Sequence, residues 1–376
     1  MVRFLHTADW QMGMRAVHTG NKSKEIRLKR YVTAQKIVNI AQQKKVGFVL
    51  IAGDLFEHPD VDEVVVKKTV DILNQFAPIP VFILPGNHDP YIPGGIWDRT
   101  SWQRVGSHIH LLTVEEEIDL GSNVAIFPCP VKQKRSSLDP TSWIPKRAIT
   151  DEKIRIGIAH GSLDSLPGEI NFPISIKCAD DKGLDYLALG DWHSFSQYGR
   201  SIYPGTFEPT SYDEPDSGNI VIVDIPAPQV SPNFEKLRCS TLTWAKFSLD
   251  IQDITDLEKF EEKLKALGSY STLVIRINLR IHIQHDDRVF QQLKTLRDEL
   301  DEMAFFLQWE QVEISVNPDL EAQLPEGLVQ GVNEALTDIL LGKIPQPPCN
   351  VFAGEDRAVV QKAKSMLRSF RRGGMK

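Results

Sequence analysis

The 376-residue sequence predicts a layered α/β fold. Up to residue 84, short apolar runs at 2–6, 46–52 and 79–84 alternate with segments of near-helical periodicity at about 26–45 and 62–76. Alternating strands and helices indicate a sheet covered by helices. Further strand-like runs joined by turns begin near residue 108, at 108–114, 118–130, 154–161, 185–193 and 218–225. They predict a second sheet packed on the first.

A second unit follows the Pro-containing stretch 226–233. Its pattern predicts a compact domain of β-α-β-β or β-α-β-α-β type, with strands at 244–251, 272–280 and 309–316 and helices at 256–267 and 286–303. Two more helices are expected at about 320–341 and 355–370, separated by the proline-rich linker 343–350, which cannot continue a helix. The predicted domains are therefore 1–235, 240–317 and a helical tail at 318–376.

Composition is that of an ordinary soluble protein, with 41% hydrophobic and 25% charged residues. No apolar run approaches the ~20 residues that a membrane helix needs, and the first residues do not resemble a signal peptide. The net charge of −7 argues against holding nucleic acid by bulk electrostatics alone, but it does not exclude a nuclease. The cysteines are far apart and form no C-x-x-C pair, which indicates reduced thiols in a cytoplasmic protein.

The functional signal is a series of short polar motifs, each just after a predicted strand. In order they are Asp9-Trp10-Gln11, Gly53-Asp54, Gly86-Asn87-His88-Asp89, Ala159-His160-Gly161 and Gly190-Asp191-Trp192-His193. The carboxyl ends of strands are where open α/β sheets place their ligand sites. Any one of these residues alone would be read as a cap, a turn or a core residue. The full set in this order predicts a site.

This mixture of residues suits a two-metal phosphoesterase. Such a site holds two cations ~3.5–4 Å apart and needs a bridging carboxylate, for which Asp54 is the candidate. The other ligands are carboxylate, amide and imidazole groups, which suit manganese, iron or zinc. The motif 86–89 is the most specific of the set, because turn formation does not require a histidine at position 88.

The set resembles the calcineurin-like metallophosphoesterase superfamily and, within it, the SbcD-type DNA repair nucleases. Gly53-Asp54-Leu55-Phe56 is similar to the second motif of that group, and Tyr203-Pro204-Gly205-Thr206-Phe207-Glu208 resembles its Tyr-x-Gly-Ser-x-Glu stretch. The small domain and the C-terminal helices resemble its cap domain and its ATPase-binding tail in order and size. The resemblance implies a four-layer αββα core, a small α+β cap domain and C-terminal helices.

The resemblance also assigns roles to the motif residues. One metal would be held by Asp9, Gln11, Asp54 and His193, and the other by Asp54, Asn87, His160 and Asp191. His88 would be the general acid toward the leaving oxygen, with Asp89 orienting its imidazole. The implied activity is cleavage of DNA as an exonuclease and endonuclease, with an SbcC-like coiled-coil ATPase as partner, a homodimer as a possible assembly and the nucleoid as the place of action.

Two positions depart from the family pattern, which has histidine where Gln11 and Asp191 stand. The formal charge of the ligands becomes −3 instead of −2, and the extra oxygen ligands favour Mn²⁺, with Mg²⁺ or Fe²⁺ as alternatives. The same departures also fit a degenerate site. A histidine often follows the second motif directly in the family; here Glu57 intervenes, which leaves the role of His58 open. A phosphoesterase for a nucleotide or cyclic nucleotide and a non-catalytic scaffold for the ATPase are the alternative functions.

Overall fold

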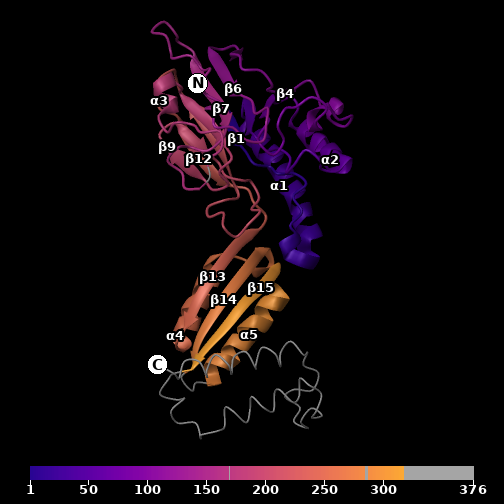
Figure 1. Ribbon diagram of the computed structural model, residues 1–376, viewed down its shortest axis with the longest axis vertical. Helices are drawn as coiled ribbons and strands as arrows, with labels where there is room; N and C mark the ends of the chain where they lie inside the picture. Colours follow the sequence, from indigo (N-terminus) through magenta and orange to yellow (C-terminus); the bar gives the residue numbers. More distant parts are fainter. Residues whose placement is uncertain (169, 284–286, 317–376) are drawn as a thin grey trace.

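The computed structural model describes residues 1–168, 170–283 and 287–316 (Figure 1). Its first sheet has six strands in the order β12-β11-β1-β2-β3-β4. The central strands β1 (Val2–Thr7), β2 (Phe48–Ala52), β3 (Val81–Leu84) and β4 (Ile109–Leu111) are parallel to one another. The strands β11 (Asn219–Ile225) and β12 (Asn233–Arg238) extend the sheet beside β1 in the antiparallel sense.

Helices α1 (Ser23–Lys44) and α2 (Glu63–Leu73) cover one face of this sheet. The apolar positions of α1 that are buried, such as Ala34, Ile37 and Val38, pack with strand residues such as Val49 and Ile51. Ile37 and Val38 are among the apolar residues whose near-helical spacing predicted the helix. Short 3-10 helices follow or precede these elements at Val17–Lys22, Asn74–Phe76, Ile96–Asp98 and Trp102–Arg104.

The second sheet also has six strands, in the order β5-β6-β7-β8-β10-β9. They are β5 (Ile118–Asp119), β6 (Val124–Cys129), β7 (Ile154–His160), β8 (Tyr186–Gly190), β9 (Ser196–Tyr198) and β10 (Ser201–Tyr203). A buried apolar layer that includes Phe4, Phe48, Ile156 and Tyr186 joins the two sheets. The outer face is covered by the short helix α3 (Cys178–Lys182) and by loops. The predicted αββα layering is confirmed, with a thin fourth layer.

The assignment of the later strand-like runs to the second sheet was wrong for two of them. The runs at 108–114 and 218–225 contribute β4 and β11, which both lie in the first sheet. Strand β11 returns along β1 with Val2 opposite Ile225 and His6 opposite Val221. Without β11, strand β1 would have an unpaired edge. Pairing with β1 closes that edge and buries nearly all of β11. Sequence order alone does not say which sheet a returning strand joins.

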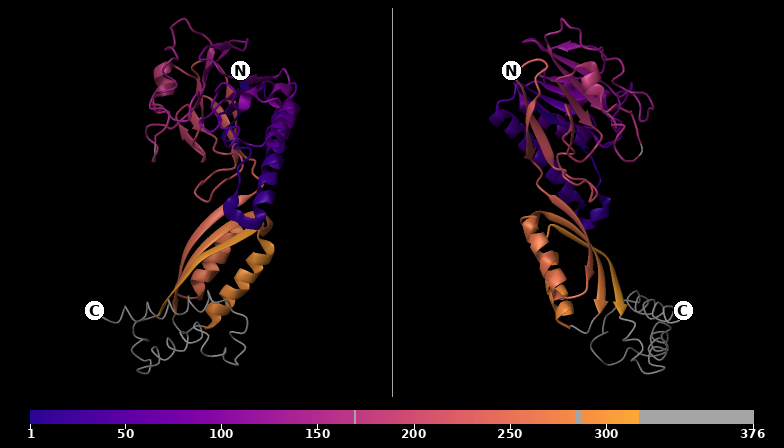
Figure 2. Two further views of the ribbon diagram at one scale, coloured as in Figure 1. Left: turned by 45° about the vertical axis from the view of Figure 1, so that its right-hand side comes forward. Right: turned by 90° about the vertical axis from the view of Figure 1, so that its left-hand side faces the viewer.

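The small domain is a three-stranded parallel sheet, with β13 (Thr243–Ile251), β14 (Leu273–Ile283) and β15 (Phe306–Val316) in that order. Helices α4 (Ile254–Ala266) and α5 (Asp287–Met303) connect the strands and cover one face of the sheet (Figure 2). Of the two expected patterns, β-α-β-α-β is the one observed. A 3-10 turn at Tyr270–Thr272 precedes β14.

The small domain lies at the end of the molecule toward which the start of α1 points (Figure 2). A buried cluster joins the two parts, with Met14, Ala16 and Ile26 from the larger part and Leu242 and Val274 from the smaller. Among the described helices, none combines the length and the apolar character that crossing a bilayer requires. The predicted tail at 318–376 lies outside the described residues.

Candidate metal centre

All the predicted site residues lie at one edge of the molecule's two sheets. Asp9 and Gln11 follow β1, Asp54 follows β2, and residues 87–89 follow β3; His160 ends β7, and residues 191–193 follow β8. Because the strands of each set are parallel, their carboxyl ends meet at the same edge. Residues from both sheets therefore line one cavity of about 560 Å³, which includes Gln11, Asp54, His88, Asp191 and His193.

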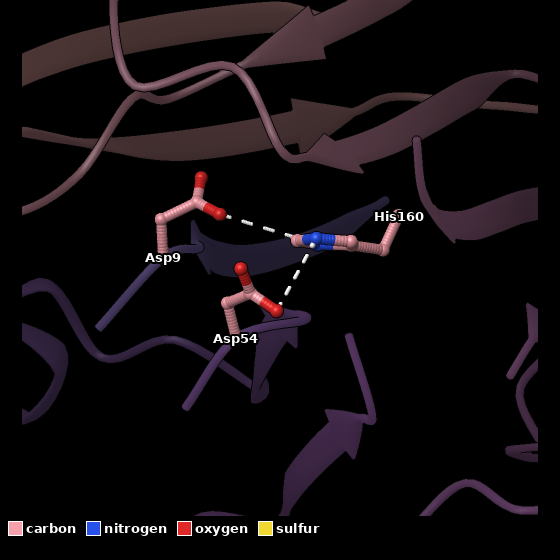
Figure 3. A group of neighbouring side chains, drawn as sticks. All are labelled: Asp9, Asp54 and His160. Carbon is pink, nitrogen blue, oxygen red and sulfur yellow. Dashed lines mark ion pairs between the residues drawn. The ribbon is translucent and has the colours of Figure 1, made fainter. Parts of the chain in front are cut away.

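The centre of the site is a buried cluster of Asp9, Asp54 and His160 (Figure 3). The Nε2 atom of His160 lies 3.4 Å from Oδ1 of Asp54, and its Nδ1 atom lies 4.0 Å from Oδ1 of Asp9. The same Nε2 atom is 2.8 Å from Oδ1 of Asn87, and Nδ1 is 3.0 Å from the carbonyl oxygen of Ala52. A donor on Nδ1 leaves Nε2 as the nitrogen that faces the carboxylate and the amide oxygen.

The electrostatics of the cluster fit a bound cation. The Oδ2 atom of Asp9 is buried and has no hydrogen-bond partner among the described residues, although a buried carboxylate needs compensation. Burial raises the pKa of Asp9 to about 6. Burial alone would lower the pKa of His160, but the carboxylates of Asp54 and Asp9 raise it well above its ordinary value. A divalent cation among these atoms would supply the missing positive charge.

The remaining predicted ligands adjoin this cluster. Oδ1 of Asp191 lies 3.9 Å from Nε2 of His160, while its backbone N–H donates to Oδ1 of Asp9 at 3.1 Å. Nε2 of Gln11 lies 2.9 Å from Nε2 of His193. The structure therefore brings Asp9, Gln11, Asp54, Asn87, His160, Asp191 and His193 together, and their assignment to particular metals stays a prediction.

Backbone strain concentrates at the same positions. Asp9, Gln11 and Asp54 have φ of 52°, 41° and 50°, and Asp191 has φ of 101°. Residues with side chains rarely adopt such values, and each one costs of order 1–3 kcal/mol. Left-handed conformations that persist at four of the predicted ligand positions point to a functional constraint on where these side chains lie.

Two glycines beside the ligands are required by close approach. Gly53 has φ of 88°, and a Cβ atom there would overlap Nδ1 of His160. A Cβ atom on Gly86 would overlap Oδ1 of Asp54. Gly53 therefore makes room for His160, which comes from the second sheet, and Gly86 makes room for Asp54, which follows the neighbouring strand β2.

His88 is held at two points, by its ring and by its backbone. Its Nδ1 atom lies 2.7 Å from the carbonyl oxygen of Glu57, and its backbone N–H donates to Oδ1 of Asp54 at 2.9 Å. The expectation that Asp89 orients the imidazole was wrong. The carboxylate of Asp89 accepts instead from the backbone N–H groups of Gly86 and Phe56, at 2.7 and 2.9 Å, so it shapes the loop that carries His88.

The sequence interpretation missed two polar partners of the ligands. Ser162 donates its hydroxyl to Oδ2 of Asp191 at 2.7 Å, and Oε1 of Glu214 lies 2.6 Å from Nδ1 of His193. Burial would lower the pKa of His193, but the bond to Glu214 raises it to about 9. Ser162 stands two residues after His160 and could have been suspected from that spacing. Glu214 lies in a polar loop without any motif.

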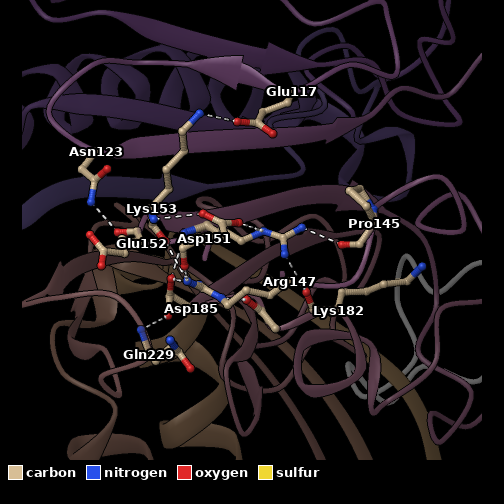
Figure 4. A network of polar contacts seen from close by, with 12 residues as sticks. Glu117, Asn123, Pro145, Arg147, Asp151, Glu152, Lys153, Lys182, Asp185 and Gln229 are labelled. Carbon is tan, nitrogen blue, oxygen red and sulfur yellow. Dashed lines mark hydrogen bonds and ion pairs between the residues drawn. The ribbon is translucent and has the colours of Figure 1, made fainter. Parts of the chain in front are cut away.

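The opposite ends of β7 and β8 are fixed by a polar network (Figure 4). Asp185, which is buried directly before β8, accepts from Nη2 of Arg147 at 2.5 Å and from the backbone N–H of Arg155 at 2.8 Å. Its second oxygen accepts from the backbone N–H of Gln229 at 2.6 Å. The network therefore joins the starts of β7 and β8 to the loops that carry Arg147 and Gln229, at the ends of the strands away from His160 and Asp191.

Comparison with known proteins gives a family match. The model of the calcineurin-like phosphoesterase family matches residues 2–195. The chain is 25% identical over 238 residues to the uncharacterized metallophosphoesterase YhaO of Bacillus subtilis strain 168, covering 60% of this chain and 57% of that protein. It is 33% identical over 275 residues to the SbcD subunit of the nuclease SbcCD of Staphylococcus saprophyticus, covering 63% of this chain and 69% of that protein.

A third relative is the DNA double-strand break repair protein Mre11 of Aeropyrum pernix. It is 25% identical over 276 residues, which cover 67% of this chain and 64% of that protein. The chain thus spans less than two thirds of the length of YhaO and of this Mre11.

Proposed function

The chain belongs to the calcineurin-like phosphoesterase family, and we propose that within it the protein is a metal-dependent DNA exonuclease and endonuclease acting in DNA repair. Membership of the family implies metal-dependent hydrolysis of phosphoesters. The observation that carries the proposal is the buried cluster of Asp9, Asp54 and His160 at the carboxyl edge of two sheets. His88 lines the same cavity and gives it a candidate acid.

The ligands divide into two sets that share Asp54. Asp9, Gln11, Asp54 and His193 would hold one cation, and Asp54, Asn87, His160 and Asp191 would hold the other. When bound, the two cations would polarise a phosphoryl oxygen and lower the pKa of a water molecule. The oxygen-rich set favours Mn²⁺, with Mg²⁺ or Fe²⁺ as alternatives.

The protein's own groups would position the substrate and move the proton. Nδ1 of His88 is anchored at the carbonyl of Glu57, so Nε2 is the nitrogen that can face a substrate. In this role, a protonated His88 donates to the oxygen that leaves as the phosphodiester bond breaks. The backbone bond from His88 to Asp54 fixes the distance between the acid and the cluster.

A second cavity supports a polymeric anion as substrate. It measures about 530 Å³, lies between α1, α2 and the loop after β1, and shares Arg15 and His58 with the metal-centre cavity. Its lining includes the cationic Lys24, Arg27 and Lys68 and the acidic Asp60 and Asp62, and cationic side chains are in excess. Cationic side chains that follow a groove suit the repeated phosphates of a nucleic acid, and a small substrate would not extend that far. The names of the SbcCD and Mre11 relatives agree with this substrate class.

The proposed partner is an SbcC-like coiled-coil ATPase, which the tail at 318–376 would bind. The tail carries an apolar stripe at helical spacing near 359–370, the pattern of a helix that lies in a partner's groove. We place the complex at the nucleoid in the cytoplasm, with a homodimer as its proposed assembly. A protein truncated at residue 344 should keep metal-dependent activity and no longer co-purify with the ATPase.

The test of the function is a comparison of substrates under defined metals. Linear duplex DNA, single-stranded circular DNA, a cyclic nucleotide and a phosphomonoester are incubated with Mn²⁺ or Mg²⁺, alongside the variant Asp54→Asn. We expect cleavage of both DNA forms, dependent on Mn²⁺ and absent in the variant. Turnover of the cyclic nucleotide alone would instead make this a small-substrate phosphoesterase. A protein that binds the ATPase but cleaves nothing would be a scaffold.

A further inference from the structure

His193 has a polar partner on each ring nitrogen. Nδ1 lies 2.6 Å from Oε1 of Glu214, and Nε2 lies 2.9 Å from Nε2 of Gln11. An ionised carboxylate only accepts hydrogen bonds, so Nδ1 carries the proton and donates it to Glu214. In the neutral ring, the lone pair is then on Nε2 and faces the cavity. A histidine must present an unprotonated nitrogen to bind a cation, and this contact selects that nitrogen.

The position of Glu214 does not depend on His193. Its Oε2 atom accepts from the backbone N–H groups of Thr210 at 2.7 Å and Ser211 at 3.2 Å. The Thr210 hydroxyl donates to Oε1, and the side chain of Glu214 is only 8% exposed. The loop 210–214 therefore closes on its own carboxylate and presents it to the histidine in a fixed orientation.

The other side of this loop contacts the small domain. The ring of Tyr212 lies 4.9 Å from that of Trp244 on β13, and the guanidinium of Arg276 on β14 lies 4.3 Å from the centre of the Tyr212 ring. Asp213 pairs with Lys246 on β13 at 3.3 Å. Successive residues of one short loop thus hold the small domain and the site histidine.

We propose that residues 210–214 form a coupling loop, in which Glu214 is the positioning residue that keeps Nε2 of His193 directed at the metal centre and Tyr212 ties that geometry to the small domain. The inference rests on the proposed role of His193 as a metal ligand. Carboxylates behind ligating histidines fix the tautomer and the ring orientation, and their loss typically weakens metal binding by ~10–100-fold. The loop would make the metal affinity of one site depend on how the small domain packs.

The experiment measures metal binding without any substrate. Chelator-treated protein is titrated with Mn²⁺, and free Mn²⁺ is counted by electron paramagnetic resonance. The variants are Glu214→Gln, His193→Ala and their combination, with Glu235→Gln as the control. Glu235 is an exposed glutamate that pairs with Lys44 at 2.8 Å, so its loss tests for a general effect of removing a carboxylate.

Glu214→Gln should weaken one of the two sites by ~10–100-fold and leave the other unchanged. Glu214→Gln should cause no further weakening in the His193→Ala background, because Glu214 would act on the metal only through the His193 ring. Trp244→Ala should weaken the same site less, and it should lose its effect in the Glu214→Gln background. The control should bind as the parent does.

Parent-like affinity at both sites in Glu214→Gln would overturn the inference. So would an equal loss in the His193→Ala background, which would indicate a purely structural role. If Glu214→Gln does not fold, Glu214→Asp serves instead. Its shorter side chain cannot reach both the loop and the histidine, and parent-like binding in that variant would have the same consequence. A protein that binds two Mn²⁺ ions but leaves DNA intact would refute the nuclease proposal and not this one.

Discussion

Replacing His88 with alanine tests the acid that the proposed reaction needs. The imidazole contacts the carbonyl oxygen of Glu57 through Nδ1, whereas the backbone N–H of the same residue donates to Asp54. Only the first contact is lost in His88→Ala. The ring belongs to neither of the two proposed ligand sets, so the variant should keep its metals.

The expected loss is therefore confined to proton donation. General acid catalysis is worth ~10²–10⁴-fold, which corresponds to about 2.7–5.5 kcal/mol of transition-state stabilisation. The loss should appear in full on DNA, whose leaving oxygen is strongly basic. It should nearly vanish on bis(p-nitrophenyl) phosphate, because nitrophenolate leaves without protonation.

The assay compares kcat/KM on these two substrates for the parent, His88→Ala and His110→Ala, with metal content measured for each. His110 is the matched control, because it lines neither cavity and its ring stacks on Phe82 with the ring centres 4.9 Å apart. Full activity of His88→Ala on DNA would refute the reasoning. An equal loss on both substrates together with lost metal would show that His88 acts on the metal centre instead.

Three further predictions concern the metal centre. In metal-free protein, the contact with Glu214 raises the pKa of His193 to about 9. The ion pair of His193 with Glu214 therefore contributes stability that is fully present below pH 6.5 and is lost as the pH rises through 9. Denaturant unfolding should show a fall on the order of 3 kcal/mol over that window, and a flat profile would contradict it. Gly53→Ala should displace His160 and weaken the one metal site that His160 would hold, and calorimetry that finds parent-like Mn²⁺ affinity at both sites would contradict it. Gln11→His should shift preference toward Zn²⁺ and Asp191→His should reduce activity. The double variant should recover more than the product of the two effects, and strictly multiplicative rates would exclude compensation.

The position of the site could be predicted from the sequence because it depends on local features of the chain. Each motif follows a strand, and parallel strands bring their carboxyl ends together. The same reasoning found the helices α1 and α2 within a few residues. It could not place β11, because an antiparallel return beside β1 is a choice between two available sheet edges.

Contacts between loops were beyond the reach of local patterns. Glu214 meets His193 across 21 positions that include the short strands β9 and β10, and no spacing rule covers such a contact. The family resemblance implied that Asp89, which directly follows His88, orients its imidazole. The loop instead turns its carboxylate toward Gly86 and Phe56. Sequence adjacency is a poor guide where the backbone leaves regular structure.

The loops after β1 and β2 continue to pair beyond the sheet. The backbone N–H of Asp9 donates to the carbonyl of Gly53 at 3.1 Å, and that of Gln11 donates to the carbonyl of Asp54 at 2.9 Å. The pairing occurs with Asp9, Gln11 and Asp54 in left-handed conformations. Hydrogen bonds between the loops thus maintain a strained arrangement that directs both carboxylates into the same buried space.

This arrangement should make the metal-free protein more stable when Asp9 is replaced by asparagine. Burial raises the pKa of Asp9 from 3.8 to about 6. The ionised form is therefore disfavoured in the folded state, and stability falls as the pH rises from 3.8 through 6. The cost at pH 7 is on the order of 3 kcal/mol, which Asp9→Asn would remove. Thermal unfolding should show a higher Tm than the parent in chelator and a smaller rise than the parent's on adding Mn²⁺, because only the second set of ligands remains complete. A lower Tm than the parent in chelator would mean that the Asp9 carboxylate stabilises the fold, and a rise with Mn²⁺ equal to the parent's would mean that Asp9 is not a ligand.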